Sequence, residues 1–153
     1  MIEVYRFHKS KYPGNSGKGA AIYGGRWNAP GIEAVYAAQS RSLGALEILV
    51  HYAVLPREFV VTPIRIPDRV IAKRSWISNH KNKQVDLPYG VTQKVAAEWF
   101  PKTALLDVPS AIIPQERIYV LNPLHPDFQY IQFLDPEPFS FDPRLRTDPT
   151  STH

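Results

Sequence analysis

Apolar and polar residues alternate at the start of the chain. Residues 2–7 read Ile-Glu-Val-Tyr-Arg-Phe, a period of two that is typical of a strand with one buried face. Later apolar stretches, bounded by glycine, proline or polar residues, predict further strands. These stretches are residues 32–38, 59–66, 105–114, 117–121, 128–133 and 139–141. The proline at position 63 predicts that its strand lies at a sheet edge or carries a bulge.

Helical spacing occurs in two segments. Ser40 is placed to cap a helix that runs to about residue 54. Nearly every face of that helix is apolar, which predicts that the helix is buried. A second helix begins near Thr92 and is stopped by Pro101.

Polar segments connect these elements. Residues 9–21 predict a long loop, and residues 68–89 a short structured piece followed by an exposed loop, with Trp76, Asn79 and His80 in that segment. Strands outnumber helices, and the helices interrupt them irregularly. The sequence therefore predicts an α+β fold with mixed or antiparallel sheets, as one compact domain over residues 1–146 with a flexible tail at 147–153.

Composition narrows the class of protein. The 153 residues suffice for one domain with a sizeable core, and 44% of them are hydrophobic. No apolar run reaches the roughly 20 residues that span a bilayer, and no signal peptide is visible. The chain has no cysteine, which excludes disulfides and thiol catalysis. We expect a cytoplasmic protein, and the net charge of +4 favours anionic partners.

One glycine-rich stretch suggests a ligand site. Residues 24–31 read Gly-Gly-Arg-Trp-Asn-Ala-Pro-Gly, in which glycines allow close backbone approach and Arg26 can bind carboxylate or phosphate. The alternative is a hairpin loop with a surface arginine and a packed Trp27. The Gly17-Lys18-Gly19 sequence lacks the preceding strand and the third small residue of a dinucleotide fingerprint, so we reject that interpretation.

A carboxylate stands on the apolar stripe of the first predicted helix. Glu47 shares that stripe with Leu43 and Val50, so it must be paired, protonated or used in chemistry. The alternative is a structural salt bridge to an arginine. His51 lies one turn further on and favours a packing or supporting role. No spacing indicates a metal site, and no metal is expected.

Two further residues carry open alternatives. Arg6 falls on the same strand face as Val4, where a charge is costly, but it could also reach water from the end of the strand. Ser110 follows Pro109 at a strand break, and a turn serine that satisfies the backbone is the simpler interpretation.

Taken together, these residues resemble the RES-domain family, toxins of bacterial toxin–antitoxin pairs with a Xre-type antitoxin. The resemblance runs from Val4 to about Leu145 and is specific as a composite. It consists of Gly-Gly-Arg-Trp-Asn-x-x-Gly, Val-Tyr-Ala, Ala-Leu-Glu-x-Leu-Val-His, Val-Pro-Ser, Asn-Pro-x-His-Pro and Phe-Asp-Pro-Arg-Leu. Gly44 departs from the more usual alanine, at about 1 kcal/mol in a helix interior. Ile118 stands where an asparagine is expected.

The resemblance implies a fold similar to that of ADP-ribosyltransferase toxins and an activity on NAD+. That activity is cleavage of the nicotinamide–ribose bond by water or phosphate, or transfer of ADP-ribose to a protein. The matching site residues are Glu47, Arg26 and Tyr36 as catalytic groups and Arg6, Arg26, Tyr36 and Ser110 as NAD+-binding groups. NAD+ is the substrate and no prosthetic group is implied. An antitoxin is the implied partner, nucleic acid is contacted only through it, and a homodimer is left open.

Elementary chemistry agrees with this assignment. Nicotinamide departs neutral, so no general acid is needed, and one carboxylate in a low-dielectric site can stabilise the cation left on the ribose. Glu47 suits that role, and the sequence shows no second Asp or Glu in a comparably apolar setting. Arg6 and Arg26 would hold the pyrophosphate, or Arg6 would pair with Glu47 in the empty site. Tyr36 would stack on nicotinamide or hydrogen-bond beside it, and Ser110 would hold a ribose or amide group.

Two other functions remain open at this point. A nucleic-acid-binding module would use the positive charge and exposed aromatic rings, and its affinity would fall steeply with salt. An inert interaction protein would have kept the fold and lost catalysis.

Overall fold

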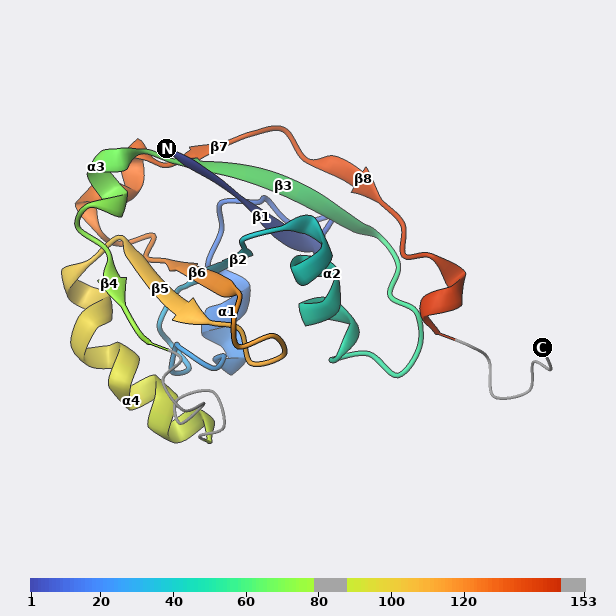
Figure 1. Ribbon diagram of the computed structural model, residues 1–153, viewed down its shortest axis with the longest axis horizontal. Coiled ribbons are helices and arrows are strands. Elements are labelled where there is room, and N and C mark those ends of the chain that lie inside the picture. Colours follow the sequence, from blue (N-terminus) through green and yellow to red (C-terminus); the bar gives the residue numbers. More distant parts are fainter. Residues whose placement is uncertain (79–87, 147–153) are drawn as a thin grey trace.

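The computed structural model describes residues 1–78 and 88–146 of the chain. Within these residues the strands join into one eight-stranded mixed sheet (Figure 1). The strands are β1 (Ile2–Lys9), β2 (Val35–Ala38), β3 (Phe59–Ile66), β4 (Ser75–Trp76), β5 (Leu105–Pro109), β6 (Arg117–Leu121), β7 (Gln132–Phe133) and β8 (Glu137–Phe139).

The sheet has the strand order β4-β5-β6-β2-β1-β3-β7, and β8 also pairs with β3. All neighbours are antiparallel except β4 and β5. β1 pairs with β3 along its whole length, from Ile2 opposite Ile66 to Lys9 opposite Phe59. Because the crossovers are irregular and antiparallel pairs dominate, the predicted α+β class is confirmed.

Short helices cover parts of this sheet (Figure 1). The helical segments are α1 (Lys18–Tyr23), α2 (Arg41–Leu49), α3 (Asp68–Ile71), α4 (Tyr89–Trp99), η2 (Phe100–Lys102), η3 (Pro126–Tyr130) and η4 (Pro143–Leu145). α2 lies against β1 and β2, and the end of α4 packs onto β5 and β6 through Ala96 and Phe100. No helix within residues 1–78 and 88–146 is long and apolar enough to cross a membrane.

The two faces of the central strands belong to different parts of the core. Val4 packs with Val35 and Ala37 in one cluster, whereas Phe7 packs in another cluster beneath α2. Because strand side chains alternate between faces, Arg6 points to the face of Val4, away from α2. The side of β1 and β2 that faces α2 is therefore the side opposite Arg6.

The helices α1 and α2 differ from the sequence prediction, and α4 begins at Tyr89, three residues before the predicted start near Thr92. α1 begins at Lys18, inside the segment predicted to be a loop. Ser40 caps α2 as predicted, accepting from the Leu43 N–H at 3.2 Å, but α2 ends at Leu49. After that residue the backbone turns through i→i+3 hydrogen bonds.

The prediction that this helix is buried on nearly every face is also wrong. Only Leu43, Gly44 and Leu49 of α2 are buried, while Leu46 is 38% and Val50 57% exposed. Apolar residues occupy more of the surface of α2 than the sheet covers, because the helix touches the sheet on one side only.

The proline at position 63 does not mark an edge strand. β3 lies inside the sheet, with β1 on one side and β7 and β8 on the other. The Pro63 carbonyl accepts from the Leu134 N–H at 2.9 Å, between the end of β7 and the start of β8. The nitrogen and the carbonyl of Pro63 both point toward β7 and β8. At this position the backbone pairing passes from one of these strands to the other, so the missing N–H of proline costs no hydrogen bond between strands.

Residues 128–133 form less strand than predicted. η3 occupies the first half of the segment, residues 128–130, and only Gln132–Phe133 pairs with β3. His125 caps η3 by accepting from the Asp127 N–H at 3.1 Å, and Pro126 stands at the first position of the turn, where it favours helical geometry. The expectations for Asn79 and His80 and for a flexible tail at 147–153 lie outside the described residues.

Candidate active site

Asn28 fastens the glycine-rich loop to the rest of the domain. Its side chain is buried, and Nδ2 donates to the carbonyl oxygens of Ala20 and Ile32 at 2.9 and 2.8 Å. Its Oδ1 accepts from the Tyr36 hydroxyl at 2.6 Å. All these bonds are internal, which makes Asn28 a structural anchor between α1, the loop and β2.

Tyr36 holds the same loop from β2. Its hydroxyl donates to Asn28 and accepts from the Trp27 N–H at 3.0 Å. Burial raises the pKa of Tyr36 far above its usual value, so the hydroxyl remains protonated at neutral pH. A Cβ on Gly25 would stand 2.8 Å from the Tyr36 hydroxyl oxygen, which explains the glycine by a contact within the protein.

Arg26 is positioned from the side of α4. Gln93 Nε2 donates to the Gly25 carbonyl at 2.7 Å, and the Thr92 hydroxyl donates to the Arg26 carbonyl. The Arg26 guanidinium lies 5.0 Å from the centre of the Tyr89 ring, within cation–π range. The backbone on both sides of Arg26 is thus fixed, and its side chain reaches the cavity described below.

Glu47 is held by a buried serine. Ser110 is fully buried, and its Oγ accepts from the N–H groups of Ile112 and Ile113, both at 3.1 Å. These two bonds use the acceptor capacity of the hydroxyl, so its proton is directed to Glu47 Oε1 at 2.7 Å. The carboxylate is therefore oriented by a neutral group.

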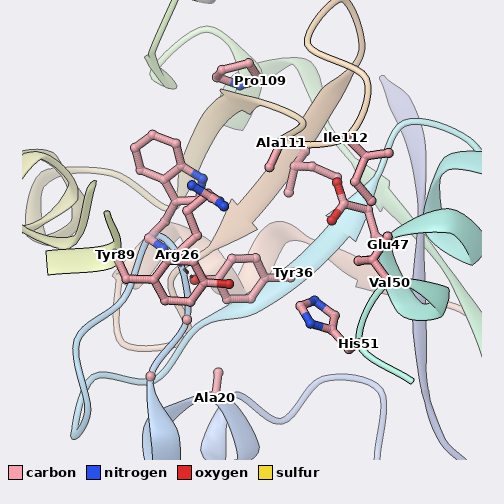
Figure 2. A pocket seen from close by; sticks show the side chains of 14 residues that line it. Ala20, Arg26, Tyr36, Glu47, Val50, His51, Tyr89, Pro109, Ala111 and Ile112 are labelled. Carbon is pink, nitrogen blue, oxygen red and sulfur yellow. Dashed lines mark hydrogen bonds between the residues drawn. The ribbon is translucent and has the colours of Figure 1, made fainter. Parts of the chain in front are cut away.

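Arg26, Tyr36 and Glu47 meet around one cavity of about 620 Å³. Figure 2 shows Arg26 and Tyr89 on one side of it, Glu47, Val50 and His51 on the other, and Tyr36 between them. The lining residues are Ala20, Gly24, Gly25, Arg26, Trp27, Tyr36, Glu47, Val50, His51, Tyr89, Pro109, Ala111, Ile112 and Ile118. The cavity therefore has a cation and a carboxylate on facing walls.

The structure places the other two predicted site residues elsewhere. Ser110 is not exposed to the cavity and reaches it only through Glu47. Arg6 lies on the opposite face of the sheet, where its Nη1 donates to the carbonyls of Gly14 and Ser16, both at 2.9 Å. Burial lowers the pKa of Arg6 to about 10, which leaves it charged at neutral pH. No ion pair joins Arg6 to Glu47 in the described part of the chain.

Sequence reasoning missed Tyr89, which lines the cavity, and one carboxylate outside it. His51, to which the sequence gave a packing or supporting role, also lines the cavity. Asp107 is only 3% exposed, so the prediction of no second carboxylate in an apolar setting is wrong. Its position between Leu106 and Val108 in an apolar strand was the signal that could have found it.

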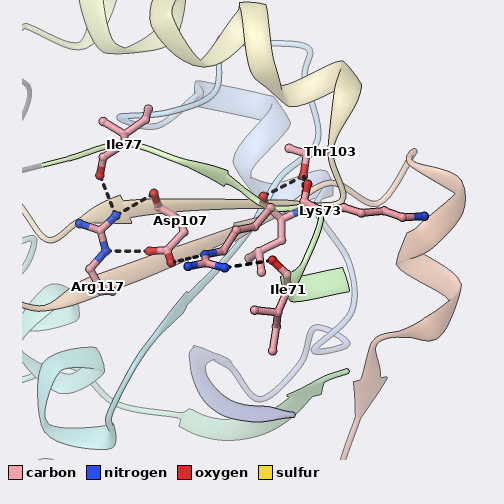
Figure 3. Close-up of polar contacts among 8 residues, drawn as sticks. Ile71, Lys73, Ile77, Thr103, Asp107 and Arg117 are labelled. Carbon is pink, nitrogen blue, oxygen red and sulfur yellow. Dashed lines mark hydrogen bonds and ion pairs between the residues drawn. The ribbon is translucent and has the colours of Figure 1, made fainter. Parts of the chain in front are cut away.

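Asp107 is part of an ion-pair network at the β4 edge of the sheet (Figure 3). Arg117 Nε donates to it at 2.7 Å, Arg74 Nε lies 3.2 Å away, and both guanidinium groups lie over the Trp76 ring. Burial raises the pKa of Asp107, while Arg117 and then Arg74 act to lower it. Asp107 does not line the cavity. Across the described ranges, no three His, Asp or Glu side chains gather as ligands for a metal ion.

Comparison with known proteins extends over nearly the whole chain. The RES domain model matches residues 3–142. Toxin Res of Photorhabdus laumondii is 38% identical over 149 residues, covering 93% of this chain and 96% of that protein. Toxin Res of Yersinia enterocolitica is 35% identical, covering 94% and 99%. A Prs ADP-ribosylating toxin of Sphingobium is 39% identical over 138 residues, covering 85% of each chain.

A solved structure shares the fold. The toxin in the MbcT–MbcA toxin–antitoxin complex of M. tuberculosis superposes with a TM-score of 0.65 at 20% identity, covering 94% of this chain and 86% of that one. This chain therefore shares the fold of that structure, a single α+β domain. From the family match and the curated relatives together, the chain belongs to the RES-domain family of toxins.

Proposed function

We propose that this chain is a toxin that consumes NAD+ by breaking the bond between nicotinamide and ribose. The observation that carries the proposal is the Glu47 carboxylate, fixed by a buried neutral hydroxyl at 2.7 Å on a wall of a cavity of about 620 Å³. The facing wall carries Arg26. A cavity of this size falls in the usual range for small-molecule and cofactor sites.

The chemistry needs little more than such a carboxylate. As the bond between ribose C1′ and the ring nitrogen lengthens, the electron pair goes to nitrogen and the positive charge moves to the ribose. A preorganised negative charge beside C1′ stabilises that cation, as one carboxylate does in glycosidases. Nicotinamide leaves neutral, so no second carboxylate is required as a general acid. Glu47 supplies the charge, and Ser110 keeps it in place.

The opposite wall would hold the phosphates. Arg26 offers a planar array of donors to the pyrophosphate, and the contacts of its backbone to α4 keep it oriented. Tyr36 sits between the two walls, with its hydroxyl committed to Asn28 and Trp27. In this proposal the Tyr36 ring, rather than its hydroxyl, contacts the substrate.

The proposal has two versions, which differ in the molecule that accepts the ribosyl group. Water or phosphate would make the chain an NAD+-degrading enzyme. A protein acceptor would make it an ADP-ribosyltransferase, and the relative of 39% identity whose name is Prs ADP-ribosylating toxin favours this second candidate. Both outcomes use the same bond cleavage at Glu47.

A protein antitoxin is the proposed partner. Three of the curated relatives bear the name Toxin Res, and the structural neighbour was solved with its antitoxin. We propose an antitoxin of the Xre family, which would provide any contact with nucleic acid. The toxin would act when this partner is removed.

The test is release of nicotinamide from NAD+ by the purified toxin, freed of any partner. We expect release by the wild type and none by Glu47→Ala, whereas Glu98→Gln, at an exposed position on α4, serves as a control that retains activity. Comparing reactions with and without phosphate, and with labelled NAD+ in cell lysate, separates the three acceptors. A folded wild type that leaves NAD+ intact under all three conditions would contradict the proposal.

A further inference from the structure

A second, smaller cavity adjoins the first at Glu47. It has a volume of about 110 Å³ and shares Tyr36, Glu47 and Ile118 with the larger cavity. Beyond these shared residues its walls are apolar or aromatic, with Phe7 and Ala38 among them. Glu47 therefore stands where the larger cavity, which carries Arg26, meets a small apolar one.

The small cavity is built by the close packing of α2 on β1 and β2. A Cβ on Gly44 would stand 2.7 Å from two ring carbons of Phe7, so glycine lets the helix backbone approach the ring. Ala38 projects from β2 on the same face, since it pairs with Tyr5 across the strands. Its methyl group leaves space that a larger side chain would occupy. The cavity thus depends on small residues at two positions, one on the helix and one on the sheet.

We propose that this smaller cavity receives the nicotinamide ring during cleavage, an inference that rests on the proposed function. The carboxylate that stabilises C1′ must lie beside the bond that breaks, so the two fragments separate on different sides of Glu47. The larger cavity, with Arg26, takes the ribose and phosphates. The volume of the smaller one suits a single six-membered ring with its amide.

The apolar lining favours the departure of the ring. In the substrate the ring is a pyridinium cation, and after cleavage the same ring is neutral, because the electron pair of the C1′–N bond has moved to nitrogen. Removing a cation from water is costly, whereas burying a neutral aromatic ring against Phe7 is favourable. The cavity therefore favours the product form of the ring, while Glu47 stabilises the charge that stays on the ribose. The acceptor then bonds to C1′ and loses its proton.

Binding of the separated products tests this assignment without turnover. Free nicotinamide and ADP-ribose are titrated singly and together by ligand-observed NMR against wild type, Ala38→Val and the surface control Ala97→Val. We expect both products to bind the wild type at once, since they occupy different cavities. Ala38→Val should weaken nicotinamide about tenfold, as expected for added methyl groups in a fitted pocket, and leave ADP-ribose unchanged. Ala97→Val should change neither.

A complementary variant enlarges the cavity in case Ala38→Val fails to fold. Phe7→Leu should admit quinoline-3-carboxamide, a larger ring that the wild type excludes. Equal nicotinamide binding by wild type and a folded Ala38→Val, or competition between nicotinamide and ADP-ribose in the wild type, would overturn the assignment. Failure of Phe7→Leu to bind quinoline-3-carboxamide would also overturn the assignment. These failures differ from failure of the proposed function, which would appear as no ADP-ribose binding and no nicotinamide release from NAD+ by the wild type.

Discussion

Two carboxylates of this domain, those of Asp107 and Glu47, are held by partners of different charge. Asp107 is almost fully buried at one edge of the sheet and is held by Arg117 at 2.7 Å and Arg74 at 3.2 Å. Glu47 is half-buried beside a cavity and is held by the neutral Ser110 hydroxyl at 2.7 Å. The more deeply buried carboxylate is the one whose charge is compensated.

The difference shows that burial alone does not identify a reactive carboxylate. Around Asp107 the arginines neutralise its field, so the group joins β4, β5 and β6 and offers nothing to a ligand. Ser110 orients Glu47 without cancelling its charge, which remains available to a developing cation in the cavity. The partner of each carboxylate therefore decides its role.

Replacing Arg117, the closer of the two arginines that pair with Asp107, should give the largest loss of stability. Arg117→Met leaves the buried Asp107 charge with Arg74 alone and removes the donor to the Ile77 carbonyl. We expect a loss of about 3 kcal/mol in the free energy of unfolding, measured by urea denaturation. The exposed pair of Arg65 and Glu3 is the control, and Glu3→Gln should cost about 1 kcal/mol or less. An equal effect of both changes would contradict the contrast between the two environments.

Moving the Glu47 charge without removing it should cost activity rather than stability. Glu47→Asp withdraws the carboxylate by about one methylene length from Ser110 and from the cavity. We expect nicotinamide release to fall about 100-fold, because misplacement by about 1 Å has effects of that size. Steady-state kinetics should place the loss in kcat rather than KM. Full activity of this variant would show that the exact position of the charge is unimportant.

Removing the hydroxyl that orients Glu47 should have an intermediate effect. Ser110→Ala loses the bond to Glu47 and leaves the N–H groups of Ile112 and Ile113 without their acceptor. We expect about 1–3 kcal/mol lower stability and a roughly tenfold lower kcat. Combining Ser110→Ala with Glu47→Asp should give less than the product of the two losses in kcat, because both act on one carboxylate. Strictly multiplicative losses would indicate that the serine acts independently.

Asp107 should make a small contribution to the pH dependence of the free energy of unfolding at acidic pH. Burial raises its pKa in the folded state, so above the usual carboxyl pKa the folded protein binds the proton more tightly than the unfolded chain does. The free energy of unfolding should therefore gain a contribution from Asp107 as the pH falls through its folded pKa, and lose it as the pH rises. Urea denaturation of wild type and Asp107→Asn across the mildly acidic range isolates this contribution as a difference. A difference that changes in the opposite direction would mean that the arginines outweigh burial.

Sequence patterns predicted the parts of the fold and site that depend on local order. The alternation in residues 2–7 corresponds to β1, the apolar stretch at residues 117–121 corresponds to β6, and the apolar stripe around Glu47 singled out the carboxylate. The pattern did not show that α2 would be half-exposed, because periodicity identifies an apolar face but not what covers it. It also overlooked Asp107, whose arginine partners come from β6 and from the turn before β4.

Long-range contacts explain the remaining differences within the site. The hydrogen bond from the Tyr36 hydroxyl to Asn28 forms only when the glycine-rich loop folds back onto β2. Patterns among neighbouring residues in the sequence do not predict such a contact. Arg6 was grouped with the site by the family resemblance, but it lies on the face of β1 opposite α2, where it donates to the carbonyls of Gly14 and Ser16. Which face a charged residue occupies depends on the whole sheet.

The most direct test replaces each carboxylate by its amide in the same assay. Nicotinamide release from NAD+ is measured per folded molecule for wild type, Glu47→Gln and Asp107→Asn, with folding verified by circular dichroism. We expect Glu47→Gln to lose about 10³-fold, in the range found when a group that stabilises transition-state charge is removed, and Asp107→Asn to retain its rate. Equal losses in both variants, or a folded Glu47→Gln that releases nicotinamide at the wild-type rate, would contradict the assignment of Glu47 to the reaction.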